Sequence, residues 1–422
     1  MRFSRTYHTV AADKKQWFLQ LYDKGFWYWF RIALLTTLGV LAGQLIGQAD
    51  VWREVRYKIY HFQTSKLHRR HPVDLRVAFV LVGDDEYWTG TLARRVPIKR
   101  DYLARLIRAV DKAAPAVIAM DFDLHSPTPD GSLLENPDYW CERSELLRAI
   151  KDVATRHPVV IPKSLVSSRS GRKQINKEVS DTFGSDLTSV KNVFPGYIRF
   201  APDLRMIPAR LTVEGRSEAV DSFAFAILQA YSPEMYENFV KEEKKQGTKG
   251  DEFLLRFGSF LDESAFTNLS YSAKDVLMGN PDVLQHLNHK IVLLGGKWHR
   301  DGFGAGEWSD EHLTPAGRIV GVYTHANYAE ALRLGQYYPE ISEAWIISFE
   351  VALVVGASIF LALDISKWYK IAATLGPSLV MMALSYVFLQ NLGLFFEFII
   401  PMFVLVTHNV VEHLEWRRAM QA

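Results

Sequence analysis

The chain has 422 residues, and its 49 lysine and arginine residues nearly balance its 47 aspartate and glutamate residues, which leaves a formal net charge of +2. So small an excess of positive charge does not indicate a nucleic-acid partner. Cys141 is the only cysteine, so the chain cannot form an internal disulfide. Its thiol is therefore a small buried side chain, a free thiol, or a link to a second copy in a homodimer.

Near the start of the chain, residues 32–48 form an apolar segment long enough to cross a membrane as a helix. Six lysine and arginine residues precede it, which predicts that residues 1–31 lie in the cytoplasm. A charged start followed by an apolar stretch is also typical of a cleaved signal sequence. Because no small-x-small cleavage site closes the stretch, we interpret it as an anchor.

Strand-like and helix-like segments alternate through residues 50–342. Continuous β-rich runs at 77–82 and 116–120 are typical of strands buried on both faces, and an amphipathic segment at 101–113 separates them. This alternation predicts an α/β domain with a mostly parallel sheet covered by helices. The remaining segments are strand-like at 159–161, 253–257 and 290–294, helix-like at 146–155, 222–230 and 325–334, and polar and loop-like at 164–189 and 241–249.

Three more apolar segments, 344–363, 371–389 and 394–411, follow this domain, and each is long enough to span a membrane. With residues 32–48 they predict four transmembrane helices. The positively charged flanks of all four then fall on one side of the membrane. We therefore expect both termini, including the tail 412–422, to be cytoplasmic and residues 50–342 to lie outside.

The candidate ligand site lies where the predicted parallel strands end, because ligands of open parallel sheets bind beyond the carboxyl ends of the strands. Asp84 and Asp85 follow the first strand, Asp121 and Asp123 end the second, and Asp301 lies after the last. Carboxylates around one crevice could hold a cation or an amine. The alternative is that they cap the following helices and bind loose backbone amides.

Carboxylates gathered in this way repel one another unless a positive charge lies between them. Arg100 and Arg300 are candidates for that charge, and a bound ligand or metal ion is another. No His-x-x-x-His spacing indicates zinc, so the identity of any metal stays open. The chain also contains no G-x-S-x-G elbow and no Walker loop, and we predict neither an enzyme nor a cofactor.

Several stretches of the chain resemble one known family. They are VAFVLVGDDEYW, VPIKRDYLARLIRAVDKAAPAVIAMDFDL, DSFAFAILQAY, and HKIVLLGG through LTPAGRIVGVYTHANYAEAL. Together they resemble the CHASE type 2 family of extracytoplasmic sensory domains, which follow one span and precede three more. Where relatives commonly have an aromatic-Pro-Arg run, this chain has VPIKR. The matching positions are Asp84, Asp85, Arg100, Asp121, Ser222, Phe223, Gly295, Asp301, Pro315, Gly321, His325, Ala326 and Asn327.

The resemblance implies a multi-pass sensor of the bacterial inner (plasma) membrane with an unknown small ligand. In relatives the fourth span leads into an output domain such as a kinase or cyclase, whereas only residues 412–422 follow it here. We therefore expect a separate effector protein. The alternatives are a structural or accessory subunit of a membrane complex and an extracytoplasmic metal-dependent hydrolase using Asp84 and Asp121.

Four further residues could pass a signal onward. His325 and Asn327 begin the helix-like segment that leads to the second span, where they either hydrogen-bond the helix start or, with the ligand, shift this helix. Glu350 and Glu397 lie inside apolar segments at similar depths, where an unpaired carboxylate is costly. They either share a proton and bond neighbouring hydroxyls, or one of them contacts a partner's span.

Overall fold

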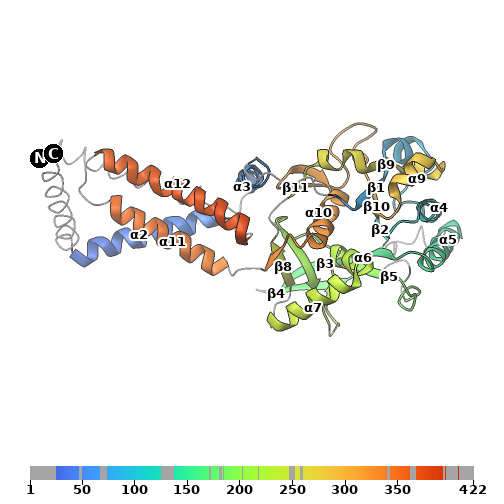
Figure 1. Cartoon of the computed structure of the whole chain (residues 1–422), viewed down its shortest axis with the longest axis horizontal. Helices are drawn as coiled ribbons and strands as arrows, with labels where there is room; N and C mark the ends of the chain where they lie inside the picture. Colours follow the sequence, from blue (N-terminus) through green and yellow to red (C-terminus); the bar gives the residue numbers. More distant parts are fainter. Residues whose placement is uncertain are drawn as a thin grey trace, which may run out of the picture. The chain divides into compact units, whose positions relative to one another are not determined.

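The computed structural model describes residues 25–46, 50–66, 74–124, 137–170, 173–179, 183, 185–201, 203–216, 218–246, 252–256, 260–339, 343–361, 367–392, 395 and 407. The chain divides into two compact units (Figure 1). One unit, here called the helical unit, comprises Met1–Gln63 and Ile341–Ala422. The other, called the sheet unit, comprises Thr64–Glu340.

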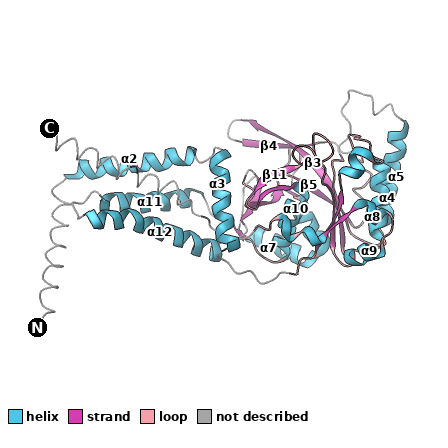
Figure 2. Cartoon of the chain, turned by 90° about the horizontal axis from the view of Figure 1, so that it is seen from above, coloured by secondary structure: helices cyan, strands magenta, loops and turns pink. Residues whose placement is uncertain are grey.

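The helical unit contains α2 (Gly25–Ile46), α3 (Asp50–His61), α11 (Glu343–Leu361) and α12 (Lys367–Leu392). Helices α2 and α11 lie side by side, and α12 lies against α11 (Figures 1 and 2). Along both α2 and α11, buried residues recur at every fourth position. Each of these two helices therefore has one buried face within the helical unit. These residues are Ile32, Thr36 and Val40 on α2, and Glu350, Val354 and Ser358 on α11.

Within the described residues, one helical segment, Gly25–Gly43, is long and apolar enough to cross a membrane. The apolar parts of α11 (Ala344–Ile359) and α12 (Leu379–Asn391) are shorter, and the predicted segment 394–411 lies outside the described residues except at positions 395 and 407. The predicted number of spans is therefore not established. The helix that contains the predicted first span begins at Gly25, seven residues before residue 32, because the aromatic residues before that position continue α2.

The sheet unit is built on a seven-stranded sheet in the order β4-β3-β2-β10-β1-β9, with β5 also paired to β3. All of its pairs are parallel except β3 with β4. The mostly parallel α/β fold is thereby confirmed. The strands are β1 (Val77–Val82), β2 (Val117–Asp121), β3 (Val159–Ser170), β4 (Lys173–Glu178), β5 (Val193–Ile198), β9 (Ser270–Ser272) and β10 (Ile291–Gly296).

Helices cover both faces of this sheet, because alternate side chains of each strand point to opposite sides. In β1, Phe79 faces a core formed with α6 (Phe223–Tyr231) and α10 (Gly321–Arg333), while Val80 faces a second core. Helix α7 (Pro233–Gln246) packs on α6. Figure 2 shows the helices of the second core along one side of the sheet. They are α4 (Arg100–Asp111), α5 (Pro137–Ala154), α8 (Ala273–Leu277) and α9 (Pro281–Leu287).

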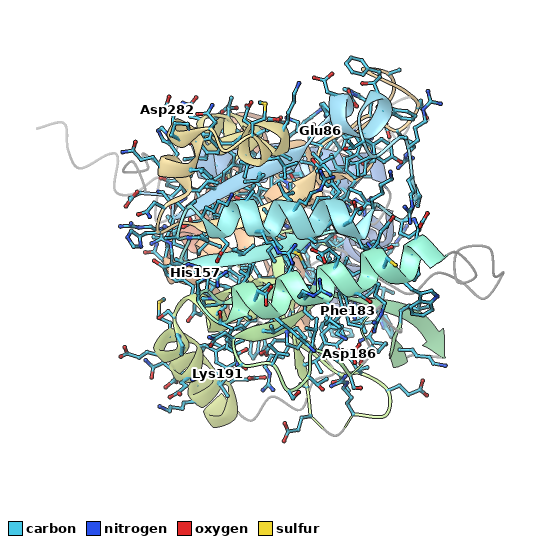
Figure 3. All side chains as sticks on the ribbon, turned by 90° about the vertical axis from the view of Figure 1, so that its right-hand side faces the viewer. Glu86, His157, Phe183, Asp186, Lys191 and Asp282 are labelled. Atoms are coloured by element: carbon cyan, nitrogen blue, oxygen red, sulfur yellow. The ribbon has the colours of Figure 1, made fainter. Side chains whose placement is uncertain are left out.

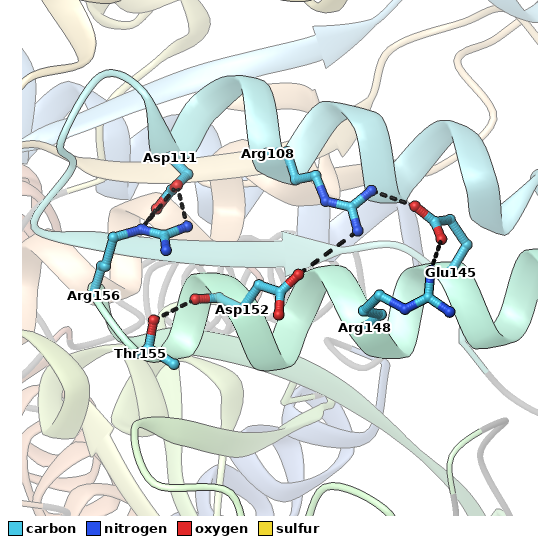
Figure 4. A network of polar contacts seen from close by, with 7 residues as sticks. All are labelled: Arg108, Asp111, Glu145, Arg148, Asp152, Thr155 and Arg156. Atoms are coloured by element: carbon cyan, nitrogen blue, oxygen red, sulfur yellow. Dashed lines mark hydrogen bonds and ion pairs between the residues drawn. The ribbon is translucent and has the colours of Figure 1, made fainter.

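Helices α4 and α5 cross one face of the sheet unit (Figure 3). Ion pairs join α4 to α5 and to the turn that follows α5. Arg108 forms an ion pair with Glu145 and lies 3.8 Å from Asp152, and Arg156 in that turn lies 2.6 Å from Asp111 (Figure 4). Partly exposed pairs of this kind contribute little free energy each, so the apolar second core is the main attachment. Cys141 is exposed on α5, and the alternative of a buried thiol was wrong.

Two smaller sheets complete the sheet unit. An antiparallel sheet joins β13 (Tyr338–Pro339), β8 (Glu252–Arg256), β6 (Met206–Leu211) and β7 (Val220–Asp221). A hairpin joins β11 (Glu311–Thr314) to β12 (Gly317–Val320). The short helical turns are η1 (Phe62–Lys66), η2 (Asp85–Thr89), η3 (Glu263–Ala265) and η4 (Thr267–Leu269).

The structure corrects three sequence predictions. The strand predicted at 253–257 pairs antiparallel with β6 and does not belong to the main sheet. The predicted loop 164–189 begins as the end of β3 and turns back as β4, because backbone pairing in a hairpin does not require apolar side chains. The predicted loop 241–249 begins as the last turns of α7, where Lys241 lies 3.8 Å from Glu237 one turn earlier.

Candidate ligand-binding site

An open cavity of about 350 Å³ lies at the carboxyl ends of β1 and β9. Parallel strands present their carboxyl ends at a common edge, so residues far apart in the chain meet here. The lining of the cavity includes the side chains of Asp84, Asp85, Glu86, Tyr271, Lys297 and Phe303.

Asp84 uses both carboxylate oxygens to hold the loop that follows β10. Its Oδ1 accepts a hydrogen bond from the backbone N of His299 at 2.8 Å, and its Oδ2 lies 2.6 Å from His299 Nδ1 and accepts from the backbone N of Gly304 at 3.0 Å. Burial alone would raise the pKa of Asp84, but these hydrogen bonds hold it below its ordinary value. Asp84 therefore shapes the cavity wall.

Two of the other charged side chains of the cavity, Glu86 and Lys297, already have partners in the protein, whereas the Asp85 carboxylate has none among the described residues. Glu86 accepts from the backbone N of Gly83 at 3.0 Å and of Lys274 at 2.8 Å. Lys297 forms an ion pair with Glu263. Asp85 is exposed, and no described residue donates a hydrogen bond to its carboxylate. The cavity thus carries a surplus of negative charge, centred on Asp85.

A second group of ionisable residues surrounds the end of β2. His325 of α10 is 3% exposed and its Nε2 lies 3.9 Å from Asp121 Oδ1, while His312 Nε2 and Asp310 Oδ1 share a hydrogen bond of 2.8 Å. The ring of Phe200 stacks on His325 with centroids 4.5 Å apart. We call the side chains of Asp121, Asp310, His312 and His325 the Asp121–His325 cluster.

Burial controls the protonation of this cluster, because a charged group loses its hydration inside the fold. Burial raises the pKa of Asp121 well above its ordinary value, and the negative charge of Asp310 raises it further. Burial lowers the pKa of His325 to about 3, although Asp310 opposes the shift. Burial alone would raise the pKa of Asp310, but the hydrogen bond from His312 lowers that pKa below its ordinary value. His325 is therefore neutral at pH 7.

Two glycines allow this cluster to form. A Cβ atom on Gly321 would lie 2.1 Å from Asp310 Oδ2, and one on Gly295 would lie 2.8 Å from a side-chain carbon of Val322. Real Cβ atoms do not approach so closely, so neither position can carry a larger residue without movement of its neighbours. Both glycines are among the positions that resemble the CHASE type 2 family, and their role follows only from the structure.

Arg100 lies apart from both groups. Its side chain is 1% exposed, and its Nη1 donates to the backbone O of Asp123 at 2.9 Å. Its backbone N donates to Glu142 Oε2 at 3.1 Å. None of Asp84, Asp85 and Asp121 forms an ion pair with it among the described residues, so the predicted arginine counter-charge at those carboxylates is not observed.

The remaining predicted site residues differ in burial: Asp301 and Arg300 are exposed, whereas Asn327 is buried. Asp301 is exposed and lies against Gly306, and Arg300 is exposed nearby. Asn327 accepts from the backbone N of Leu261 at 2.7 Å and donates to its O at 3.1 Å, so its amide pairs with a neighbouring segment. The prediction that His325 and Asn327 start the helix was wrong, because α10 begins four residues before His325, at Gly321.

The predicted single crevice is thus three separate groups: the cavity with Asp84 and Asp85, the Asp121–His325 cluster, and Arg100 with the backbone of Asp123. Among the described residues, no group of three or more His, Cys, Asp and Glu side chains could hold a metal ion. Sequence reasoning missed Glu86, Lys297, Asp310 and His312, because nothing in their spacing marks them. In the helical unit Glu350 is buried, and Glu397 lies outside the described residues.

Comparison with known proteins gives one match. A family model described as the CHASE2 domain matches residues 31–363, which include the cavity, the Asp121–His325 cluster and Arg100. No curated protein and no solved structure matches the chain. The family match covers most of the chain and confirms the resemblance seen in the sequence. The chain belongs to the CHASE2 family of extracytoplasmic sensory domains.

Proposed function

We propose that this protein is a membrane-anchored sensory module that binds a small cationic ligand in the cavity beside Asp85. The observation that carries the proposal is the cavity itself, which lies at the sheet edge where open parallel sheets bind ligands. Asp85 supplies an unpaired negative charge, and Tyr271 and the exposed ring of Phe303 supply aromatic surface that favours a cation. Asp84 and Glu86, held by backbone amides, keep the wall in place.

Ligand binding should raise the thermal stability of the detergent-solubilised chain. At a hundredfold excess over Kd the gain is about 2.7 kcal/mol. Suitable probes are Mg²⁺, Ca²⁺, spermidine and lysine. Asp85→Asn should weaken binding of the effective probe about tenfold or more, because it removes the unpaired charge. Asp282→Asn, on the exposed side of α9, is the matched control and should leave binding unchanged.

Two results would count against this site. The first is the absence of any thermal shift across the four probes. The second is an equal response of wild type and Asp85→Asn to an effective probe, which would mean that the probe binds at another site. A purely structural subunit, the alternative function, predicts the first result together with stable association in a membrane complex.

Anchoring in the membrane is supported by the surface of α2. Large apolar side chains are exposed along this helix, and a soluble surface rarely carries so continuous an apolar patch. They are Phe26, Trp27, Phe30, Leu34, Leu35, Leu38 and Leu41. With the described Gly25–Gly43 span, they favour insertion of α2 in lipid.

A separate effector protein is the proposed route of the signal, with Glu350 and Glu397 as candidate contacts in the membrane. The protein should stay in carbonate-washed membranes, and a distinct protein should co-purify with it in mild detergent. Loss of that protein in Glu350→Gln or Glu397→Gln, with unchanged yield of the chain, would assign the contact. Extraction by carbonate would contradict the anchor, and a chain that purifies alone would contradict the effector.

A further inference from the structure

The guanidinium of Arg100 is buried, and among the described residues no carboxylate lies within ion-pair distance of it, although the negative charges of Asp123 and Glu142 act on it from farther away. It is 1% exposed, and its one hydrogen bond runs from Nη1 to the backbone O of Asp123. Its Nε and Nη2 are buried and have no hydrogen-bond partner, and no described carboxylate forms an ion pair with it. Buried donors without an acceptor are rare in folded proteins, so an acceptor is expected to bind these two nitrogens.

Other arginines of the sheet unit show how unusual this is. Arg210, with 19% of its side chain exposed, lies 3.2 Å from Asp221 and 3.3 Å from Glu243. Arg333, with 15% exposed, lies 2.7 Å from Glu330. Both are more exposed than Arg100, and both have a carboxylate. Arg100, the most deeply buried of the three, therefore lacks, among the described residues, the carboxylate at ion-pair distance that Arg210 and Arg333 have.

The two unpaired nitrogens define the chemistry of the missing partner. Nε and Nη2 lie on the same edge of the planar guanidinium, and together they form a fork that matches two oxygens of one carboxylate or phosphate group. We propose that Arg100 anchors a second binding site, separate from the cavity, for a small molecule that presents such a two-oxygen anionic group.

The surroundings of Arg100 are compatible with an anion. Arg100 is the first residue of the twelve-residue helix α4, whose N-cap residue Lys99 provides no side-chain cap, and helix N-termini favour negative charge. The nearby carboxylate of Glu142 is already bound to the backbone N of Arg100 and to Arg95. Because burial weakens screening, an anion at this fork would be held more strongly than at an exposed arginine.

The experiment titrates the detergent-solubilised full chain with inorganic phosphate and, separately, with acetate, against chloride at equal ionic strength. We expect one of the two oxyanions, and not chloride, to raise the unfolding midpoint, and the arm that responds identifies the group. The same anion should slow amide hydrogen exchange in residues 95–104. Arg100→Lys keeps the charge but loses the fork, and should bind that anion about tenfold more weakly.

Arg105→Lys, an exposed arginine of the same helix, is the matched control and should bind the anion as wild type does. A response equal to that of chloride would overturn the proposal, since it would mean that the fork is filled from within the chain. Unchanged affinity in Arg100→Lys would overturn it too. If that variant does not fold, the wild-type titration and exchange decide. The response to cationic probes at Asp85 should persist in Arg100→Lys, so the two sites can fail independently.

Discussion

Between pH 7 and pH 4 the protein should lose about 3 kcal/mol of stability through His325 alone. In the folded chain the pKa of His325 is about 3, because the ring is buried against Phe200 and Phe223, although the charge of Asp310 opposes this shift. In the unfolded chain a histidine takes up its proton near pH 6.5. Below that pH the unfolded state binds the proton and the folded state does not, so stability falls with pH until about pH 3.

The measurement is the unfolding midpoint at pH 7 and pH 4 for wild type and His325→Gln. The drop should be smaller in His325→Gln, and His286→Gln, on the exposed side of α9, should behave as wild type. Asp121 acts in the opposite direction: its raised pKa stabilises the fold below about pH 4 and this stability is lost as pH rises. Comparison with the variant separates the two effects, and an equal drop in His325→Gln would refute the assignment.

Replacing Glu330 with alanine should destabilise the sheet unit by about 3 to 5 kcal/mol, the cost of breaking a buried ion pair by removing one partner. Glu330 is 2% exposed on α10. Its Oε1 accepts from the backbone N of Arg76 at 2.6 Å and of Val77 at 2.9 Å, and its Oε2 accepts from Arg333 Nε at 2.7 Å. It therefore ties the start of β1 to α10.

The free energy of unfolding of the full chain in detergent tests this expectation. Glu330→Gln retains an acceptor for the β1 amides and should lose less stability than Glu330→Ala. Glu234→Ala, at an exposed position of α7, should change stability by no more than about 0.5 kcal/mol. A similar change in unfolding free energy for Glu330→Ala and Glu234→Ala would show that the bonds of Glu330 to β1 and Arg333 do not stabilise the sheet unit.

Local patterns were sufficient for the main strands of the sheet. The runs at 77–82, 116–120 and 290–294 became β1, β2 and β10 within two residues, because strands buried on both faces are continuous apolar runs. Strand β9 was missed because Ser270–Ser272 is short and polar. The register could not be predicted either, since it depends on contacts between segments about 200 residues apart.

The candidate site was predicted only in part for the same reason. The ends of the strands correctly placed Asp84 and Asp121 at one edge of the sheet. The sequence gives no sign that Asp84 is used by His299, which lies 215 residues later, or that Asp310 and His312 come to lie beside His325. Which group a carboxylate binds depends on which loops lie beside it in the fold. Hydrophobic periodicity does not predict the course of loops.

The place of β10 in the sheet has a consequence for how the protein is made. This strand lies between β1 and β2, yet it is the last strand of the sheet to leave the ribosome. Until residues 291–296 have been synthesised, β1 and β2 each lack a neighbour and present an open hydrogen-bonding edge. About 170 residues separate the end of β2 from the strand that joins it to β1, so the core closes late and through non-local contacts. The edges of β1 and β2 are therefore open to wrong pairing until β10 appears about 210 residues after the end of β1.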